Sequence, residues 1–301
     1  MTTIFWIDGG LGRVITAIPA LLKYHKNHPN EEWYIMIPGW DYVSWGFPEL
    51  QERTFNPDVK GIFENYFMKA DKVISVEPYR VPDYYRGLIS IRESFDVVIN
   101  DTNNHDDLPP MQLKISFPEK RAAFDIIQEA KQKFGKEKTI VIQPYGSSSV
   151  IHKTGICDDS MRSIPQKMLN YFIEKLSKNY NLIFMWNQPF NDPRVHQPGP
   201  DVGFRKWAAI IEQADYFIGC DSCGQHMRKC ANKKASVVIT STDKKNTTYE
   251  DFHIIERDIP LYTGNMRISG FQSLMAANLN EPRMEFTKEE IENACEEIIE
   301  H

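Results

Sequence analysis

The sequence has few cysteines, no long apolar run and no excess of basic residues. Five cysteines are spread unevenly over 301 residues, unlike the paired spacing of a secreted disulfide framework. No apolar stretch approaches the ~20 residues that a bilayer span requires. The first ten residues, MTTIFWIDGG, have no basic segment before their short apolar run, so we expect no secretion signal. These absences predict a cytoplasmic protein without a transmembrane segment.

The charge balance limits the expected partners. Lys and Arg number 35 and Asp and Glu number 41, which gives a formal net charge of −6. Binding to duplex nucleic acid usually requires a basic field, so this total disfavours a nucleic-acid partner, although it is compatible with a local basic groove. The oligomeric state is left open. Hydrophobic residues at 42% and charged residues at 25% are typical of globular chains, and the length favours two domains.

Short apolar strands alternate with amphipathic helices along the chain. The N-terminal part predicts strands over residues 3–7, 32–37, 72–76 and 95–100 and helices over 11–26 and 119–134. The C-terminal part predicts strands over residues 139–143, 181–186, 216–220 and 235–240 and helices over 166–178, 204–213 and 222–231. This alternation indicates parallel sheets with crossover helices. We therefore predict an α/β protein with two Rossmann-like, doubly wound domains.

The expected boundaries follow from this pattern. We expect an N-terminal Rossmann-like domain over residues 1–136, a C-terminal Rossmann-like domain over residues 137–285, and a C-terminal amphipathic helix over residues 286–301. Thr287 and Glu290 have the spacing of a capping box at the start of that helix. One apolar stripe is expected on it, made of Ile291, Ala294, Cys295, Ile298 and Ile299.

Three turns rich in glycine or serine each follow a predicted strand. Their candidate binding residues are Gly10, Gly12, Gly146, Ser147, Ser148, Ser149, Asp221, Ser222, Cys223, Gly224 and His226. A turn that leads into a helix presents N–H groups and the positive end of the helix dipole, which suits a phosphate. Lys153 and Arg162 could neutralise a bound diphosphate, or could be ordinary surface residues. The first turn, GGLGR, matches neither common nucleotide-binding glycine pattern, so its glycines could serve packing alone.

The three segments around these turns resemble glycosyltransferase family 9, the heptosyltransferase-like enzymes. GGLGRVITAIPALLKYHKNHP resembles the opening turn and helix of that family, and IQPYGSSS with MRSIPQKMLNYFIEKL resembles the start of its nucleotide-binding domain. ADYFIGCDSCGQHMRKCANKKASVVIT resembles its signature turn, with Asp221, Ser222 and His226 matching. The resemblance implies the GT-B fold, in which two Rossmann-like domains face each other across a cleft. It also implies that residues 1–136 are the acceptor-side domain and residues 137–285 the nucleotide-sugar-binding domain.

The resemblance also implies an activity. It is the metal-independent transfer of a hexosyl or heptosyl group from a nucleotide-diphosphate donor to a hydroxyl of a saccharide or other acceptor, with inversion and with no cofactor besides the donor. The serine turn, Arg162 and the helix near Ser222 would hold the leaving diphosphate. Glu212 would correspond to the acid that binds the donor ribose. An ordinary carboxylate on a helix surface is an equally good interpretation of this residue.

The sequence departs from the family at two positions. Arg13 stands where the family usually has the aspartate that deprotonates the acceptor, and arginine cannot be a base at neutral pH. Asp8 and Asp101, each expected at the end of a strand, are the alternative candidates for the base. Cys223 replaces the usual glycine of the signature, and Gly224 follows it. A non-catalytic nucleotide-sugar-binding protein, which Arg13 favours, and a sugar-nucleotide epimerase or hydrolase stay open as alternatives.

Two further clusters have simpler interpretations. Cys220, Cys223, His226 and Cys230 supply four nominal zinc ligands, but thiols are ordinary core residues, and we assign no metal site. The aromatic residues between 33 and 47 could stack on a sugar, but core packing is the favoured interpretation. His105, Asp106 and Asp107 predict a solvated loop.

Overall fold

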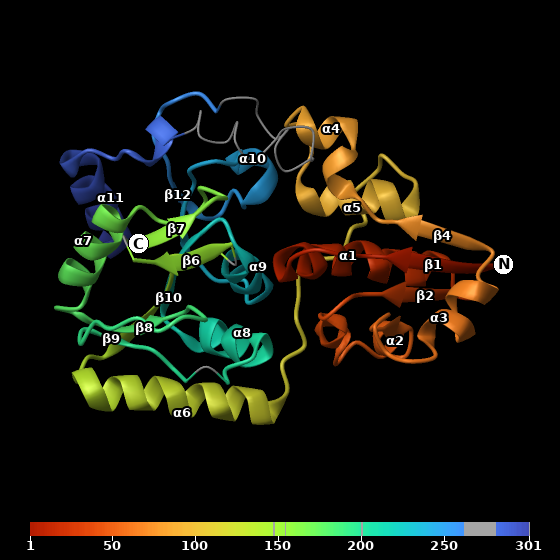
Figure 1. Cartoon of the computed structure of the whole chain (residues 1–301), viewed down its shortest axis with the longest axis horizontal. Helices are drawn as coiled ribbons and strands as arrows, with labels where there is room; N and C mark the ends of the chain where they lie inside the picture. The colour runs from red at the N-terminus through yellow and green to blue at the C-terminus, as the bar shows by residue number, and fades with distance from the viewer. Residues whose placement is uncertain (147, 154, 200, 262–280, 301) are drawn as a thin grey trace. The chain divides into compact units, whose positions relative to one another are not determined.

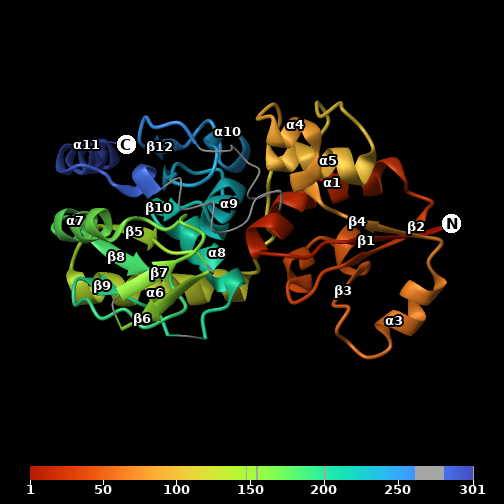
Figure 2. The ribbon, with the colours of Figure 1, turned by 45° about the horizontal axis from the view of Figure 1, so that its top comes forward.

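The computed structural model describes residues 1–146, 148–153, 155–199, 201–261 and 281–300. The chain divides into two compact units, Met1–Lys114 and Ile115–His301. Each unit holds a parallel sheet with helices beside it (Figures 1 and 2), which confirms the predicted α/β class. The division falls before the expected boundary at residue 136, because helix α6 (Phe117–Phe134) packs against α8 (Phe204–Gln213) within the second unit.

The first unit is built on a four-stranded parallel sheet with the strand order β3-β2-β1-β4. Its strands are β1 (Thr2–Trp6), β2 (Glu32–Met36), β3 (Thr54–Phe55) and β4 (Lys72–Ser75). Its helices are α1 (Leu11–Asn27), α2 (Pro48–Gln51), α3 (Ile62–Asn65), α4 (Pro82–Tyr85) and α5 (Ile91–Asn100), with 3-10 turns η1 (Asp41–Ser44), η2 (Phe67–Lys69) and η3 (Pro78–Arg80). Ile4, Phe5 and Ile35 are buried, because β1 and β2 lie inside the sheet.

The prediction of a strand over residues 95–100 is wrong, because these residues belong to α5. Ser90 and Glu93 form a capping box at the start of this helix. Buried Ile91, Phe95 and Ile99 recur at helical spacing. The β-branched side chains of this segment suggested a strand, but the cap and the burial of one helical face determine the local structure.

The second unit is built on a six-stranded parallel sheet with the order β12-β11-β10-β5-β8-β9. Its strands are β5 (Lys138–Gln143), β8 (Tyr180–Phe184), β9 (Val195–His196), β10 (Tyr216–Cys220), β11 (Ser236–Val238) and β12 (His253–Ile255). Strands β6 (Ser149–His152) and β7 (Gly155–Asp158) form a separate antiparallel hairpin. The further helices are α7 (Gln166–Leu176), α9 (Cys223–Cys230), α10 (Lys244–Thr247) and α11 (Lys288–Glu300).

Helix α11 confirms the predicted capping box. The Thr287 N–H donates to Glu290 Oε2 at 2.6 Å, and the Glu290 N–H donates to Thr287 Oγ1 at 3.2 Å. Four members of the expected stripe are buried in the core of the second unit, whereas Ile299 is 45% exposed and lies outside it. Among the helices of the described ranges, none combines the length and the apolar composition that a bilayer span requires.

A buried ion cluster joins α1 to α5 in the first unit. Lys23 Nζ lies 3.0 Å from Asp96 Oδ2 and also bonds the Asn104 carbonyl and the Asp107 carboxylate. His105 Nδ1 lies 2.8 Å from Asp96 Oδ2. The side chains of Lys23 and Asp96 are only 5% and 0% exposed. His105 and Asp107 therefore take part in this cluster. The prediction of a solvated loop is confirmed for the exposed Asp106 and Asp107, whereas the His105 side chain is only 15% exposed.

Removing the cation of this cluster should destabilise the first unit. Lys23→Met leaves the buried Asp96 carboxylate without its main partner, and we expect the free energy of unfolding to fall by about 3 to 5 kcal/mol. Denaturant unfolding measures the change. Arg121→Met, which breaks an exposed ion pair with Asp125 on α6, is the control and should have little effect. Equal stability of Lys23→Met and the parent chain would contradict the prediction.

Candidate functional site

The strand order reverses between β5 and β10 in the second sheet. From β5 the chain continues through β8 and β9 on one side, and then crosses to β10, β11 and β12 on the other side. The loops after β5 and β10 begin at the carboxyl ends of the strands on either side of this point, which is where α/β proteins commonly bind ligands. The serine turn follows β5 and the Ser222 turn follows β10, so both meet at this edge.

Gln143, the last residue of β5, connects the two turns. Its Nε2 donates to Ser222 Oγ at 3.2 Å, and its Oε1 accepts the Gly224 N–H at 2.8 Å. Ser222 is the N-cap residue of α9, and Cys223 is the first residue of the helix. A Cβ on Gly224 would overlap the Gln143 amide oxygen, so this contact requires glycine at position 224. The start of α9 is thereby held against the end of β5.

The polar side chains of the Ser222 turn are bonded within the second unit. Asp221 Oδ1 accepts a hydrogen bond from Gln225 Nε2 at 2.6 Å, and His226 Nδ1 lies 2.7 Å from Tyr249 Oη. Burial and the positive charge of Arg162 lower the pKa of His226 to about 4. The imidazole is therefore neutral at neutral pH.

Asp158, the last residue of β7, organises the loop that follows it. Its carboxylate accepts hydrogen bonds from the hydroxyls of Ser148, Ser160 and Ser163. It also accepts the main-chain N–H groups of Ser160 at 2.8 Å, Arg162 at 3.2 Å and Ser163 at 2.9 Å. Burial alone would raise the pKa of Asp158, but these hydrogen bonds outweigh it and lower the pKa to about 2. The carboxylate is therefore ionised throughout the neutral range.

The same loop is attached to the end of β11. Ser241 Oγ donates to the Ser160 carbonyl at 2.8 Å, and Thr240 Oγ1 donates to the Met161 carbonyl. The positive charge of Arg162 acts on the pKa of His226, and it opposes the rise that burial causes in the pKa values of Cys220 and Cys223. The Ile164 N–H also donates to the Pro144 carbonyl at 2.8 Å, so the loop that carries Arg162 is held at the carboxyl ends of β5 and β11, the edge of the sheet where α9 begins.

The serine turn after β5 is mostly engaged with the protein itself. Ser149 is buried, and its Oγ donates to the Gly146 carbonyl at 2.6 Å and accepts from Trp186 Nε1 at 3.2 Å. Ser148 is exposed, and its Oγ donates to Asp158 at 2.7 Å. Ser147 lies outside the described residues.

Two sequence candidates lie elsewhere in the second unit. Lys153 is exposed in the turn of the β6-β7 hairpin, whereas Ser149 and Asp158 pair at the other end of that hairpin. Glu212 Oε1 lies 2.7 Å from Lys120 Nζ of α6. It occupies the last turn of α8, which leads into the amino end of β10. Glu212 therefore lies at the edge of the sheet opposite the Ser222 turn, and the structure does not bring it to a ribose site beside that turn.

The order of the first sheet reverses between β1 and β4, and Arg13 bridges this point. Its Nη2 donates to the Val76 carbonyl, and its Nη1 lies 3.3 Å from Glu77 Oε2 and 3.5 Å from Asp8 Oδ1. The guanidinium carbon lies 5.1 Å from the centre of the Tyr79 ring. The Arg13 side chain is only 9% exposed. It is therefore fixed between the two strand ends and is no candidate for a base.

The first glycine turn supports this arrangement. Gly10 is the N-cap residue of α1 and its carbonyl accepts the Arg13 N–H at 3.0 Å, while Gly12 lies in the first turn of the helix. Gly9 has a φ of 96°, and a Cβ there would lie 3.3 Å from Arg13 Cδ. Residue 9 is thus a glycine both because of its backbone conformation and because the arginine folds back over it.

The two alternative base candidates are placed differently. Asp8 follows β1 at the order reversal, and its side chain is 58% exposed. Asp101 does not end a strand, because it is the C-cap residue of α5, with a φ of 50°. Its neighbour Asn100 donates to the Ala20 carbonyl in the middle of α1. Asp101 is therefore separated from the start of α1, where Asp8 and Arg13 lie.

Three residues of these sites were not found from the sequence: Gln143, Asp158 and Glu77. A polar residue at the end of the buried run IVIQ was a signal for Gln143, and an aspartate followed by serines two and five positions later was a signal for Asp158. No local pattern marks Glu77, because its contact with Arg13 depends on β4 pairing with β1.

The remaining clusters of the sequence are the group of cysteines with His226 and the aromatic stretch between residues 33 and 47. Burial raises the pKa values of Cys220, Cys223 and Cys230. Across the described ranges, no group of three or more Cys, His, Asp or Glu residues is arranged to hold a metal ion. Of the aromatic stretch, Trp33 is fully buried, whereas Trp45 is 51% exposed.

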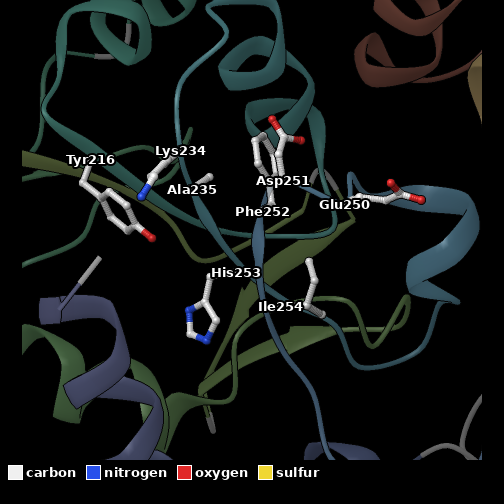
Figure 3. A pocket seen from close by; sticks show the side chains of 8 residues that line it. All are labelled: Tyr216, Lys234, Ala235, Glu250, Asp251, Phe252, His253 and Ile254. Carbon is white, nitrogen blue, oxygen red and sulfur yellow. The ribbon is translucent and has the colours of Figure 1, made fainter.

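A cavity of about 430 Å³ lies at the amino ends of β10 and β12 (Figure 3). Its lining residues are Tyr216, Lys234, Ala235, Glu250, Asp251, Phe252, His253 and Ile254. Tyr216 Oη and His253 Nδ1 both bond Ser236 Oγ, at 2.9 and 3.0 Å. Figure 3 shows the carboxylates of Glu250 and Asp251 apart from the Tyr216 and His253 rings. The cavity is at the edge of the sheet opposite Gln143, away from the serine turn and the Ser222 turn.

Sequence comparison does not identify the chain, since no family model and no curated protein sequence matches it. Structure comparison does find similar proteins. The iron-containing dodecameric glycosyltransferase TibC of enterotoxigenic Escherichia coli H10407 matches with a TM-score of 0.66 at 10% identity, over 100% of this chain and 78% of TibC. TibC has also been solved in complex with ADP-D-β-D-heptose.

Two further structures match over nearly their whole length. A family 9 glycosyltransferase of Veillonella parvula has a TM-score of 0.63 at 12% identity, over 100% of this chain and 98% of that protein. The E. coli ADP-heptose lipopolysaccharide heptosyltransferase II has a TM-score of 0.60 at 12% identity, over 94% of this chain and 100% of that protein. The chain therefore has the α/β fold, with two parallel sheets, of the family 9 heptosyltransferase structures.

Proposed function

We propose that this chain is a glycosyltransferase that binds a nucleotide-diphosphate sugar on its second unit and transfers the sugar to a hydroxyl of an acceptor bound by its first unit. The observation that supports this most is the meeting of Gln143, the loop 158–163 and the start of α9 where the strand order of the second sheet reverses. The fold shared with enzymes that include TibC, which binds an ADP-heptose, supports the same class of reaction.

The proposed reaction is a direct displacement at the anomeric carbon. The acceptor oxygen forms the new bond to that carbon, the bond to the diphosphate oxygen breaks, and the acceptor proton passes to a base. Attack from the face opposite the leaving group inverts the anomeric configuration. Arg162 and the N-terminus of α9 provide positive charge for the leaving diphosphate, whose negative charge grows in the transition state. A metal ion is not required for this role.

We propose Asp8 as the base. Arg13 stays charged and is held between Val76, Glu77 and Asp8, so it cannot take a proton. Asp8 is the most exposed carboxylate of this cluster and follows β1, at the edge of the sheet where ligands bind. Asp101 caps α5 and is set aside.

Donor binding can be measured without knowing the acceptor. We expect one of ADP, UDP and GDP to bind the parent chain in calorimetry, and Arg162→Ala to weaken that binding by about 10-fold to 100-fold, because a hydrogen bond to a charged group contributes about 1.5 to 3 kcal/mol. Lys178→Ala removes an exposed cation just before β8, at the opposite edge of the sheet, and serves as the control. Failure of all three nucleotides to bind would overturn the proposed function.

The base assignment is tested by turnover. Asp8→Asn should lower kcat by about 10²-fold to 10⁴-fold, the usual contribution of a general base, while the KM for the donor stays close to that of the parent. Acceptor-dependent release of nucleoside diphosphate is the assay, and Asp106→Asn, in an exposed loop of the same unit, is the control. Undiminished turnover by Asp8→Asn would refute the role of Asp8, and release that needs no acceptor would favour a hydrolase.

Removal of metal tests the proposed chemistry of the leaving group. Because Arg162 and α9 supply the positive charge, we expect turnover to continue after dialysis against EDTA. The rate is measured before dialysis, after it, and after addition of Mg²⁺, Mn²⁺ or Fe²⁺. A loss of activity that one of these ions restores would show that a cation takes part.

A further inference from the structure

We infer that Asp158 is a positioning residue of the donor site: its carboxylate holds the loop 158–163 so that Arg162 is presented beside the start of α9. The inference rests on the proposed function, because it concerns how that site holds the diphosphate. It also gives the serine hydroxyls of this region a different role from the one that the sequence indicated.

The first observation is the direction of the hydrogen bonds that the serine hydroxyls make. A hydroxyl has a single hydrogen to donate, and a phosphate oxygen can only accept. The hydroxyls of Ser148, Ser160 and Ser163 all donate to Asp158. Ser149 donates to the Gly146 carbonyl. These hydroxyls therefore bond the protein, and the groups suited to a diphosphate are the Arg162 guanidinium and the positive end of the α9 helix dipole.

The second observation is the backbone conformation of the loop at Met161. Met161 has a φ of 53°, in the left-handed region that is unfavourable for a residue with a side chain. Three N–H groups on either side of it, those of Ser160, Arg162 and Ser163, donate to the one carboxylate of Asp158. These bonds compensate for the unfavourable conformation of Met161. They also fix the backbone on both sides of it, and so fix the position from which the Arg162 side chain extends.

The third observation is that Asp158 contacts the main chain of Arg162. Asp158 accepts the main-chain N–H of Arg162, so it positions the residue through its backbone. The loop is bonded to the end of β11 through Ser160 and Met161, and the Ile164 N–H donates to the Pro144 carbonyl directly after β5. Arg162 therefore lies at the edge of the sheet where α9 begins, and its positive charge lowers the pKa of His226. Asp158 stays ionised at neutral pH, so the support that it gives does not depend on pH there.

A double-mutant cycle tests the inference. The probe is whichever of ADP, UDP and GDP binds the parent chain most tightly, and its Kd is measured by calorimetry for the parent, Asp158→Asn, Arg162→Ala and the double variant. Asparagine keeps the size of the side chain but replaces one acceptor oxygen by a donor. We expect Asp158→Asn to weaken binding by about 10-fold in the parent and by less than about 2-fold in the Arg162→Ala background, because coupled residues are not additive.

A carboxylate at the opposite edge of the same sheet provides the matched control. Asp215 Oδ2 accepts the Thr139 N–H at 2.8 Å, so Asp215→Asn also removes a carboxylate that supports the backbone. We expect it to lower the Tm without changing the Kd. If Asp158→Asn does not fold, Ser160→Ala removes one bond to the carboxylate, and it should weaken binding by about 3-fold only while Arg162 is present.

The outcomes separate this inference from the proposed function. If no nucleotide binds the parent chain, both are overturned. If a nucleotide binds and Asp158→Asn binds it as tightly as the parent does, or if the losses from Asp158→Asn and Arg162→Ala simply multiply, only the positioning role of Asp158 is overturned.

Discussion

The reversal of strand order in each sheet is the constraint on which both candidate sites depend. In a parallel sheet, the loops after two strands on either side of the reversal turn to opposite faces, so the edge between them is not covered by a crossover connection. The first sheet reverses between β1 and β4, and the second between β5 and β10. A side chain bridges each reversal: Arg13 in the first unit and Gln143 in the second.

The two bridges have opposite consequences for charge. Gln143 is neutral and bonds Ser222 and Gly224, so it joins β5 to α9 without adding a charge to the site. The positive charge there comes from Arg162 and from the helix N-terminus. Arg13 carries a charge, but the carboxylates of Asp8 and Glu77 lie within 3.5 Å of it. The local formal charge of that cluster is negative, which suits a group that removes a proton better than one that binds a phosphate.

Much of the fold could be predicted from the sequence, because most of the strands are short buried runs followed by turn residues. The failures have physical reasons. Residues 95–100 have β-branched side chains, but a capping box at Ser90 and a buried helical face make them part of α5. The serine turn was found, but its hydrogen-bond directions were not, because Asp158 reaches it through the β6-β7 hairpin. Local sequence patterns predict strands and helix caps, but they do not predict which side chain from a distant part of the chain bonds a given turn.

Arginine at the family's usual base position does not by itself exclude transfer. Arg13 lies in the first turn of α1, and its side chain folds back over Gly9 toward the end of β4. This leaves Asp8, which is part of the same strand-to-helix connection, as an exposed carboxylate at the carboxyl end of β1. A general base is defined by its position relative to the proton and by its charge, and not by its place in the sequence. The substitution is therefore consistent with the proposal that Asp8 is the base.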